Sequence, residues 1–328
     1  MATIIRSMRA IWYEKLGPAH EVLKSGEMPD PVPGPGEVRV RIAFSGVNPS
    51  DVKRRAGSRD AAMPFPRVIP DMDGSGVIDR VGPGVDEKRI GERVWLHSTQ
   101  WKRPFGTGAE YAVTLSQRAV PLPKGISFAA GASLGVPAMT AHRAVFGHGP
   151  VTGKTVLVTG GAGAVGFYAI QLAKWAGARV ITTVSGAEKA ELARKAGADS
   201  VVNYKTEALK EQVDHVVDVD FGANLQATLA CLRDGGSIST YASMGKPEPA
   251  IPFYPMMFKN LRLLWVFVYE MPQPAIDAAA REVNAWLATG RAVLPPLTKF
   301  PLEKLADAHI AVEKGAIGKV LVECSGEA

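Results

Sequence analysis

The feature that most constrains the fold is a glycine-rich loop between an apolar strand and a helix. Residues 155–160, TVLVTG, form a continuous apolar run, which is typical of a strand in a parallel sheet covered on both faces. Gly161, Gly163 and Gly166 then satisfy the pattern GxGxxG. The first glycine permits a tight turn, the second lets a pyrophosphate approach the backbone, and the third lets the helix pack on the strand. In this context the loop predicts a dinucleotide site, and a glycine-rich turn without a ligand is the alternative.

The helix that opens at Ala164 and Val165 supports the same prediction. Its first N–H groups have no partners within the helix and carry partial positive charge, so they can bind phosphates, and both residues belong to the predicted cofactor site. Strands and helices then alternate, as in ARVITTVS, ELARKAGAD, SVVNY, HVVDVD and GGSISTY. This alternation indicates an α/β domain with a doubly wound, Rossmann-type parallel sheet, which we place at residues 127–271.

The first third of the chain follows a different pattern. In EVRVRIAF, Val38, Val40 and Ile42 alternate with Arg39 and Arg41, which indicates a half-buried strand. Short strands such as GVIDRV and GAEYAVT follow between turn segments, so we expect an irregular antiparallel barrel or sandwich. The tail, with AIDAAAREVNAWLATG, EKLADAHIAVEKG and GKVLVEC, exceeds what one nucleotide fold needs. We therefore assign residues 1–126 together with 272–328 to the first domain.

The stretch TVSGAEK, at 183–189, bears on the choice of cofactor because it closes the second parallel strand. A carboxylate there would bind the ribose hydroxyls of NAD and repel a 2′-phosphate, but the strand closes at Ser185 without an acid. Lys189 lies one turn further on, and it is either a phosphate ligand or a solvated lysine. Ser185 and Glu188 match a capping box. We predict NADPH, bound by Ser185 and Lys189, while Tyr204 either stacks near the adenine or belongs to the core.

Composition argues against several other classes of protein. The net charge is +6, but the basic residues are scattered, and for the densest cluster, at 53–55 and Arg59, we favour a solvated loop over a nucleic-acid site. The two cysteines, Cys231 and Cys324, lack CxxC spacing, which favours buried thiols and a reducing compartment. The start, MATIIRSM, has no signal-peptide pattern, and the longest uncharged run, 126–141, is too short and too interrupted to span a membrane. We expect a cytoplasmic protein with no membrane or nucleic-acid partner.

Eight motifs occur in order between Met8 and about Val322: MRAIWYEKLG, PGPGEVRVRI, SGVNPSD, DGSGVIDRVGPGV, GERVW, GASLGVPAMTAHRAV, VLVTGGAGAVG and IGKVLVE. Together they resemble the medium-chain dehydrogenase/reductase superfamily, and within it the zinc-free quinone oxidoreductases related to zeta-crystallin. The resemblance implies a GroES-like, irregular β-barrel catalytic domain beside the Rossmann-type domain.

The resemblance also bears on metal binding. The zinc alcohol dehydrogenases of this superfamily bind a catalytic metal through a cysteine, a His-Glu pair and a second cysteine, where this chain has Asn48, Met72 with Asp73, and Pro137. These residue types do not make a tetrahedral zinc site, so we expect no metal. Without a Lewis acid the hydride acceptor must already be electrophilic. We predict an NADPH-dependent quinone reductase; the alternatives are a reductase of alkenals or enones, and an NADPH-binding structural protein with little turnover.

The resemblance implies roles for further residues. It places around the nicotinamide half of the cofactor Asn48, Thr140, Ser243, Gly245, Phe267 and Val268. It places Lys319 near the 2′-phosphate. The alternatives are that Asn48 only ties a turn, that Phe267 is core, and that Lys319 is a surface lysine. Asp51 is a candidate proton donor on position alone, but an N-cap or turn role is favoured.

Residues 261–268, LRLLWVFV, form a long apolar segment. An edge strand of this kind invites pairing across a two-fold axis, and the family resemblance also implies a homodimer. The alternative is an interior strand of a monomer.

Overall fold

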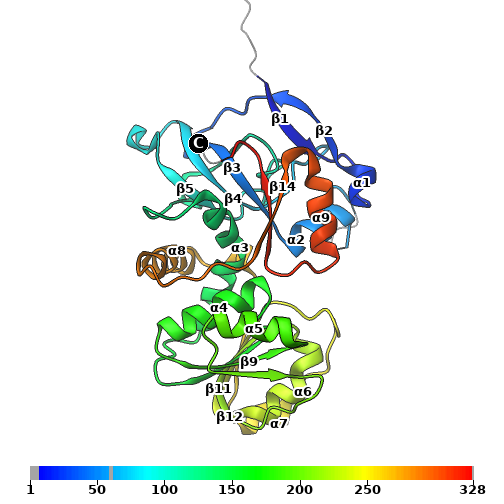
Figure 1. The fold of residues 1–328 in the computed structure, drawn as a ribbon, viewed down its shortest axis with the longest axis vertical. Coiled ribbons are helices and arrows are strands. Elements are labelled where there is room, and N and C mark those ends of the chain that lie inside the picture. The colour runs from blue at the N-terminus through cyan, green and yellow to red at the C-terminus, as the bar shows by residue number, and fades with distance from the viewer. Residues whose placement is uncertain (1–6, 59–61, 327–328) are drawn as a thin grey trace, which may run out of the picture. The chain divides into compact units, whose positions relative to one another are not determined.

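The structure is a computed structural model that describes residues 7–58 and 62–326 (Figure 1). The chain divides into two compact units: unit 1 contains the chain up to Val136 and from Pro296 onward, and unit 2 is Pro137–Pro295. These units are defined by packing, and they place helix α8 (Gln273–Ala288) in unit 2, whereas the predicted boundary at 272 places it in the first domain. That boundary stays a prediction.

Unit 1 is built mainly from strands. Its elements are β1 (Ser7–Trp12), α1 (Ala19–Val22), β2 (Lys24–Pro29), β3 (Glu37–Val47), α2 (Pro49–Ala56), β4 (Asp73–Val81), β5 (Arg93–Leu96), β6 (Tyr111–Leu115), β7 (Ala119–Pro121), the first half of α3 (Phe128–Phe146), β14 (Leu297–Pro301), α9 (Leu305–Glu313) and β15 (Lys319–Glu323), with 3-10 turns η1 (Glu87–Arg89), η2 (Ser116–Arg118) and η4 (Leu302–Lys304).

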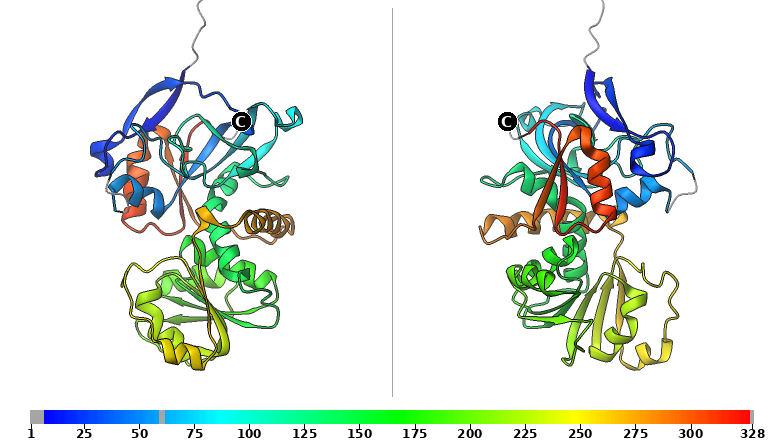
Figure 2. Two further views of the ribbon diagram at one scale, coloured as in Figure 1. Left: turned by 180° about the vertical axis from the view of Figure 1, so that it is seen from behind. Right: turned by 45° about the vertical axis from the view of Figure 1, so that its right-hand side comes forward.

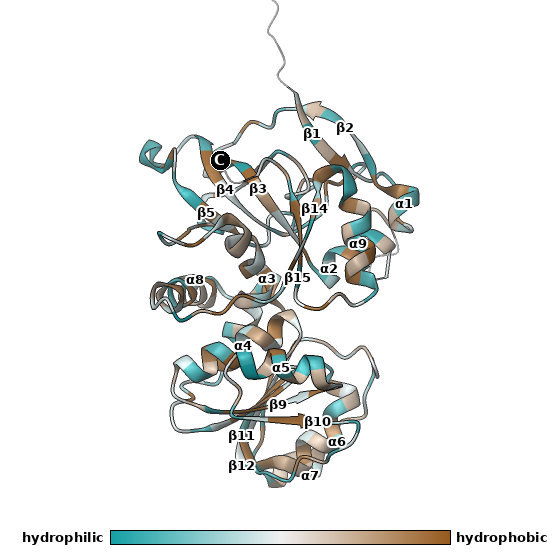
Figure 3. Cartoon of the chain, in the orientation of Figure 1, coloured by the Kyte–Doolittle hydropathy of each residue, from teal (hydrophilic) through white to brown (hydrophobic). Residues whose placement is uncertain are grey.

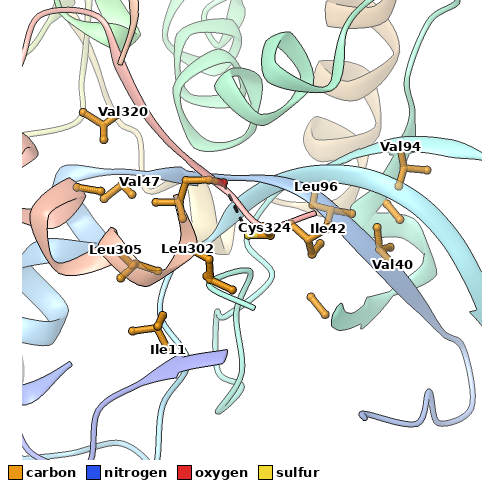
Figure 4. Close-up of a cluster of buried hydrophobic side chains, with 14 of the residues drawn as sticks. Ile11, Val40, Ile42, Val47, Val94, Leu96, Leu302, Leu305, Val320 and Cys324 are labelled. Carbon is orange, nitrogen blue, oxygen red and sulfur yellow. Dashed lines mark hydrogen bonds between the residues drawn. The ribbon is translucent and has the colours of Figure 1, made fainter. Parts of the chain in front are cut away.

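Seven of these strands form one sheet in the order β14-β15-β3-β4-β5-β7, with β6 also paired to β3. Every pairing is antiparallel except that of β14 with β15. The predicted period-two strand is thus the centre of the sheet, and its register with β15 and β4 sets Val47 opposite Val320 and Gly46 opposite Asp73. Figure 4 shows the apolar core formed where the sheet meets α9, from Ile11 to Cys324.

Unit 2 is the predicted parallel sheet. Its elements are the second half of α3, β8 (Thr155–Thr159), α4 (Ala164–Trp175), β9 (Arg179–Val184), α5 (Ala187–Lys195), β10 (Ser200–Asn203), β11 (Val213–Asp218), α6 (Phe221–Cys231), β12 (Leu232–Thr240), α7 (Phe253–Phe258), β13 (Arg262–Trp265), the turn η3 (Val268–Glu270) and α8.

The strand order β10-β9-β8-β11-β12-β13 is that of a doubly wound sheet, and all five pairings are parallel. Helices α4 and α5 cover one face, and α6 and α7 lie on the other (Figures 1 and 2). In Figure 3 strands β9 and β10 are coloured mostly on the hydrophobic side of the scale, as expected for strands that are covered by helices on both faces. The predicted strand at 261–268 is shorter than expected, because the chain leaves β13 after Trp265 and turns into η3.

Helix α3 is interrupted at Gly135, where the backbone is not helical (φ 7°, ψ −118°). The expected helix, loop and helix from residue 127 are therefore present, with the loop reduced to a kink. The carboxylate of Asp73 lies against this kink: its Oδ1 accepts a hydrogen bond from the Val136 N–H at 2.8 Å. A Cβ at Gly135 would collide with that carboxylate, which explains why glycine stands there.

The basic cluster at 53–55 is not the solvated loop that the sequence suggests. It lies on α2, and Arg55 is fully buried, with its guanidinium donating to the Gly17 carbonyl and to Glu313. Arg54 lies over the Trp101 ring, 4.5 Å from the centroid. Arg59 falls outside the described residues. Among the helices of the described chain, none combines the length and the apolar character needed to cross a membrane.

Candidate functional site

The glycine turn joins β8 to α4 in unit 2. Gly160 has a positive φ of 67°, and Gly163 closes the turn by donating its N–H to the Gly160 carbonyl at 2.9 Å. A Cβ at Gly161 would collide with Thr182, and one at Gly166 would collide with the Gly160 backbone. Only glycine fits at these two positions, so the turn is as tight as the motif predicts. The first N–H groups of α4 follow directly, which makes the turn fit the pyrophosphate of a dinucleotide.

The carboxyl ends of β9 and β10 bring together three of the predicted cofactor residues. Lys189 Nζ donates to Ser185 Oγ at 3.1 Å. The Tyr204 N–H bonds to the Val184 carbonyl at 3.1 Å, and the Tyr204 side chain is 59% exposed, which rules out the core alternative. An ammonium, a hydroxyl and an exposed aromatic ring therefore lie at the end of β9 and fit the adenosine half of a phosphorylated dinucleotide.

The predicted capping box of Ser185 and Glu188 is wrong. Helix α5 begins one residue later than that box requires, with Gly186 as its N-cap and no side-chain cap. The Ser185 hydroxyl accepts from Lys189 instead. The four-residue capping pattern does not include Lys189, whose side chain folds back by one turn and donates to the Ser185 hydroxyl.

Apart from Asn48, the residues predicted for the nicotinamide half lie on unit 2. The Ser243 hydroxyl accepts from the Gly222 N–H at 2.9 Å and donates to the Lys246 carbonyl at 2.6 Å. The Gly245 N–H donates to the Asp220 carboxylate at 2.9 Å, so the loop after β12 is tied to the start of α6. Val268 is buried and Phe267 is 46% exposed, which rules out the core alternative for the phenylalanine. Thr140 is buried in the second half of α3.

Asn48 and Lys319 meet inside unit 1, although 271 residues separate them. Lys319 Nζ donates to Asn48 Oδ1 at 2.6 Å and to Asp73 Oδ2 at 3.2 Å. Asn48 Nδ2 donates to the same Asp73 oxygen at 2.8 Å. All three side chains are buried, so the surface alternative for Lys319 is wrong. We call this group the Lys319–Asp73–Asn48 triad; it fixes the orientation of the Asn48 amide, because each end of that amide has a different partner.

Asp51 holds the turn that begins α2. Its Oδ2 accepts the Asn48 N–H at 2.8 Å, which is the turn role that the sequence favoured. The carboxyl is buried, and its Oδ1 has no partner among the described residues. Burial raises the pKa of Asp51 well above its ordinary value, and the nearby carboxyls of Asp71 and Asp73 raise it further. The environment thus favours the protonated acid.

Comparison with known proteins accounts for both units. The alcohol dehydrogenase GroES-like domain family matches residues 34–124, and the zinc-binding dehydrogenase family matches residues 164–285. The quinone oxidoreductase of Rattus norvegicus is 32% identical over 98% of this chain and 99% of its own length. The chain belongs to the quinone oxidoreductase branch of the medium-chain dehydrogenase/reductase superfamily. A mycobacterial protein of known structure, solved with NADPH, is 27% identical, covers 96% of this chain and 99% of its own, and superposes with a TM-score of 0.83.

A second kind of relative is similar in sequence over most of this chain. The NADPH-dependent alkenal/one oxidoreductase of Arabidopsis thaliana is 29% identical over 98% of this chain and 81% of its own length. Family membership therefore gives an oxidoreductase with a GroES-like and a Rossmann-type domain. The acceptor of the hydride is a separate question.

The positions that match the zinc ligands of medium-chain alcohol dehydrogenases are occupied differently here. Asn48 and Asp73 belong to the buried triad, and Met72 is fully buried. Among residues 7–58 and 62–326, no group of three or more His, Cys, Asp and Glu side chains is placed to hold a metal ion. The Asp73 carboxylate is paired with the Lys319 ammonium, and the amide of Asn48 and the thioether of Met72 are poor donors for zinc.

Sequence reasoning missed several polar residues of this site. Asp218 ends β11 and Asp220 follows it, at the same edge of the sheet as the glycine turn, and both accept hydrogen bonds there. The signal was present: two acids close a strand that neighbours the strand before the glycine loop, at the edge where such sheets bind ligands. Thr159 and Gly245, however, which donate to these acids, lie 59 and 25 positions away in the chain, and no local pattern indicates them.

Proposed function

We propose that this chain is an NADPH-dependent quinone reductase that passes a hydride to a quinone without a metal. The observation that carries the proposal is the contact of Lys189 with Ser185 at the end of β9, because an ammonium and a hydroxyl favour a 2′-phosphate and a carboxylate would repel one. The NADPH-bound mycobacterial relative and the rat quinone oxidoreductase support the cofactor and the acceptor, respectively.

In this proposal NADPH supplies the hydride, and the protein binds, orients and shields the reactants. The glycine turn receives the pyrophosphate, and Lys189 with Tyr204 receives the adenosine half. Placing a quinone against the nicotinamide can contribute up to about 7–11 kcal/mol to lowering the barrier. The residues that we place along the nicotinamide half are Asn48, Thr140, Ser243, Gly245, Phe267 and Val268.

We also propose roles for two buried residues of unit 1, Lys319 and Asp51. Lys319 acts through Asn48 and Asp73, since its ammonium is buried with those partners, rather than at the 2′-phosphate. Asp51 is the proposed proton donor to the reduced quinone, because its raised pKa favours the acid form that can give up a proton.

The test is to follow the oxidation of NADPH and NADH by absorbance against a benzoquinone, a naphthoquinone, an enone and an alkenal, with a chelator present throughout. We expect turnover of the quinones with NADPH, unaffected by the chelator. Loss of activity to the chelator would overturn the metal-free part. Binding of NADPH without oxidation by any acceptor would turn the proposal into a structural, nucleotide-binding role.

Reduction of activated double bonds is the second candidate. It is favoured by the similarity to the Arabidopsis alkenal/one oxidoreductase, and it needs the same cofactor and no Lewis acid. Turnover of only the enone or the alkenal in the panel would establish it in place of quinone reduction.

Replacing Lys189 by alanine is expected to weaken NADPH binding by about 10- to 100-fold, which is the contribution of a charge-assisted contact to a phosphate. NADH binding should stay nearly unchanged, because NADH has no 2′-phosphate. Fluorescence titration of both cofactors measures the effect, and Lys195→Ala on the same helix is the matched control because Lys195 pairs with Glu191. Equal losses for the two cofactors would contradict the assignment of Lys189.

We also propose that the chain forms a homodimer through β13 and α7. Strand β13 is an edge of the six-stranded sheet, and large apolar side chains are exposed beside it. Figure 3 shows α7 largely on the hydrophobic side of its scale. The exposed fractions are 65% for Phe253, 72% for Phe258 and 59% for Trp265. An edge that pairs with no further strand within residues 7–58 and 62–326, and that is flanked by such side chains, is an association surface, and a second copy offers the complementary edge.

Light scattering should therefore give twice the chain mass of 34.9 kDa for the wild type. Trp265→Glu is expected to weaken association by at least about 30-fold, because a buried interfacial aromatic contributes about 2 kcal/mol or more and the new charge would be desolvated. Trp175→Glu changes another exposed tryptophan, at the end of α4, and should leave the mass unchanged. A wild-type mass equal to one chain would rule the dimer out.

The cytoplasmic location stays a proposal that rests on the two cysteines. Cys231 and Cys324 are both free and buried, as predicted. Burial raises the pKa of the Cys231 thiol to about 11, so it is not a reactive thiolate at neutral pH.

A further inference from the structure

Asp218 lies at the point where the parallel sheet reverses its strand order. It is the last residue of β11, and β11 pairs with β8, which runs directly into the glycine turn. Strand β8 has β9 on its other side, so the ends of β8 and β11 flank the crevice where doubly wound sheets bind their ligand. Asp218 thus stands beside the turn that we assign to the pyrophosphate.

One oxygen of Asp218 joins three segments. Its Oδ1 accepts from Thr159 Oγ1 at 2.9 Å, from Asn224 Nδ2 at 2.7 Å and from the Asp220 N–H at 3.1 Å. Thr159 is the last residue of β8, and Asn224 lies on α6. The Asp218 side chain is fully buried, so these hydrogen bonds form away from water, where losing one leaves a costly unpaired group.

The Thr159 hydroxyl passes this constraint to the glycine turn. While it donates to Asp218, it accepts the Val219 N–H at 2.9 Å. Val219 in turn covers Gly160: a Cβ built on Gly160 would lie 3.0 Å from Val219 Cγ1. Gly160 carries the positive φ of 67° that starts the turn. The Asp218 carboxylate therefore fixes Thr159, which precedes the turn. Through the Thr159 hydroxyl it also fixes Val219, whose side chain packs on Gly160.

A carboxylate in this place has two opposed effects on a bound dinucleotide. Its charge repels the pyrophosphate, whereas its hydrogen bonds hold the turn in the shape that receives it. The other oxygen, Oδ2, has no partner among the described residues, and the charge is therefore only partly offset. An asparagine would keep an acceptor for Thr159 and Asn224 and remove the charge, which lets an experiment separate the two effects.

We infer that Asp218 is a positioning residue for the dinucleotide, acting through Thr159 and Val219 on the glycine turn. This inference rests on the proposed function, since it takes NADPH as the ligand. It assigns the affinity for the pyrophosphate part of the cofactor to a buried acid that does not touch the cofactor.

The variants are Asp218→Ala, Asp218→Asn and Thr159→Val. The affinity of each for NADPH is measured by fluorescence titration, and its affinity for adenosine 2′-monophosphate is measured by calorimetry or NMR. Asp218→Ala and Thr159→Val are expected to weaken NADPH by about 10- to 100-fold, through loss of hydrogen bonds to a charged group. Asp218→Asn should stay within about 3-fold of the wild type. The double variant Asp218→Ala/Thr159→Val should lose no more than Asp218→Ala alone, because both changes break the same connection.

Adenosine 2′-monophosphate separates positioning from general damage. It offers the Lys189 end of the site a phosphate but lacks the pyrophosphate, so its affinity should not change in any of the three variants. In steady state, KM for NADPH should rise while kcat at saturating NADPH stays near the wild-type value. A change confined to general stability would weaken both ligands in proportion, and that result would overturn the inference.

The outcomes distinguish the inference from the proposed function. If the wild-type protein binds no NADPH, the inference and the proposed function are both wrong. Wild-type protein that binds NADPH, with Asp218→Ala and Thr159→Val within about 3-fold of it, keeps the function and overturns the inference. If circular dichroism shows that Asp218→Ala does not fold, the result for Thr159→Val decides, because this change replaces the hydroxyl with a methyl group and nearly conserves the side-chain volume.

Discussion

Replacing Lys319 by methionine is expected to lower the free energy of unfolding by about 3–5 kcal/mol near neutral pH. The reason is that Asp73 would remain in the interior, where it is fully buried, without the ammonium that lies 3.2 Å from its Oδ2. Methionine keeps the length of the side chain and its apolar stem, so the loss reports the missing charge. Urea unfolding at about pH 7.5 measures it.

Two further variants sharpen this test. Burial raises the pKa of Asp73, so its protonation on acidification should reduce the cost of Lys319→Met. The double variant Lys319→Met/Asp73→Asn removes both charges and should recover most of the loss. Lys304→Met breaks an exposed contact with Asp307 and should cost no more than about 0.5 kcal/mol. A Lys319→Met loss as small as that of Lys304→Met would show that the triad carries no net stabilisation.

Acidification from about pH 7.5 to about pH 5 is expected to remove about 2 kcal/mol of stability for each of two buried histidines. Burial lowers the pKa of His97 to about 4 and that of His215 to about 4. An unfolded histidine binds its proton near pH 6.5, so between about pH 6.5 and pH 4 the unfolded chain takes up protons that the folded chain refuses. Their contribution is complete above that window and is lost as the pH falls through it.

The His215 ring shows why protonation is resisted. Its Nε2 lies 2.8 Å from the Ala144 carbonyl oxygen and its Nδ1 lies 2.8 Å from the Ser237 hydroxyl. A neutral ring with its proton on Nε2 donates to the Ala144 carbonyl and accepts from the Ser237 hydroxyl at Nδ1. A second proton on Nδ1 would prevent the ring from accepting a hydrogen bond from that hydroxyl. Asp51 and Asp73 act in the opposite sense, because burial raises their pKa and protonation then favours the folded state.

The measurement therefore compares pH profiles rather than single values. His215→Gln should flatten the fall in unfolding free energy between about pH 6.5 and pH 5, relative to the wild type. His20→Gln replaces a histidine of α1 whose side chain is 62% exposed, and it is the control for the substitution itself. Parallel profiles for the wild type and His215→Gln would contradict the assignment of His215.

The parts of the fold that sequence reasoning recovered are those with a local signal. The parallel sheet is recognisable because β8 is nearly continuous in apolar residues and because strands and helices alternate after it. The glycine turn is recognisable because its glycines follow that strand directly, and Gly161 and Gly166 stand where a side chain would collide with neighbouring atoms. The central strand of unit 1 is recognisable because its polar and apolar residues alternate. Such patterns report the immediate surroundings of a residue, and they suffice for the fold class.

The parts that sequence reasoning did not recover depend on distant partners. The burial of Lys319 follows from the register of β15 against β3 and of β3 against β4, which sets three remote segments side by side. Arg55 turned inward for the same reason, since its partner Glu313 belongs to α9. Strand β13 ended early because the chain enters η3, which no apolar run indicates. The hydrogen bond from Thr159 to Asp218 likewise joins residues that lie 59 positions apart in the chain.

The buried triad also limits how this scaffold can be re-engineered. Asn48→Cys with Met72→His would restore two ligand types of the zinc-dependent relatives, yet a divalent ion placed there would meet an ammonium that already occupies the Asp73 carboxylate, 2.6 Å from the side chain at position 48. Cation and metal would compete for one acid. A designer who wants a metalloenzyme from this chain must therefore replace Lys319 first. The stability of unit 1 would then depend on the bound metal, because the metal would take the place of the ammonium as the cation paired with the buried Asp73 carboxylate.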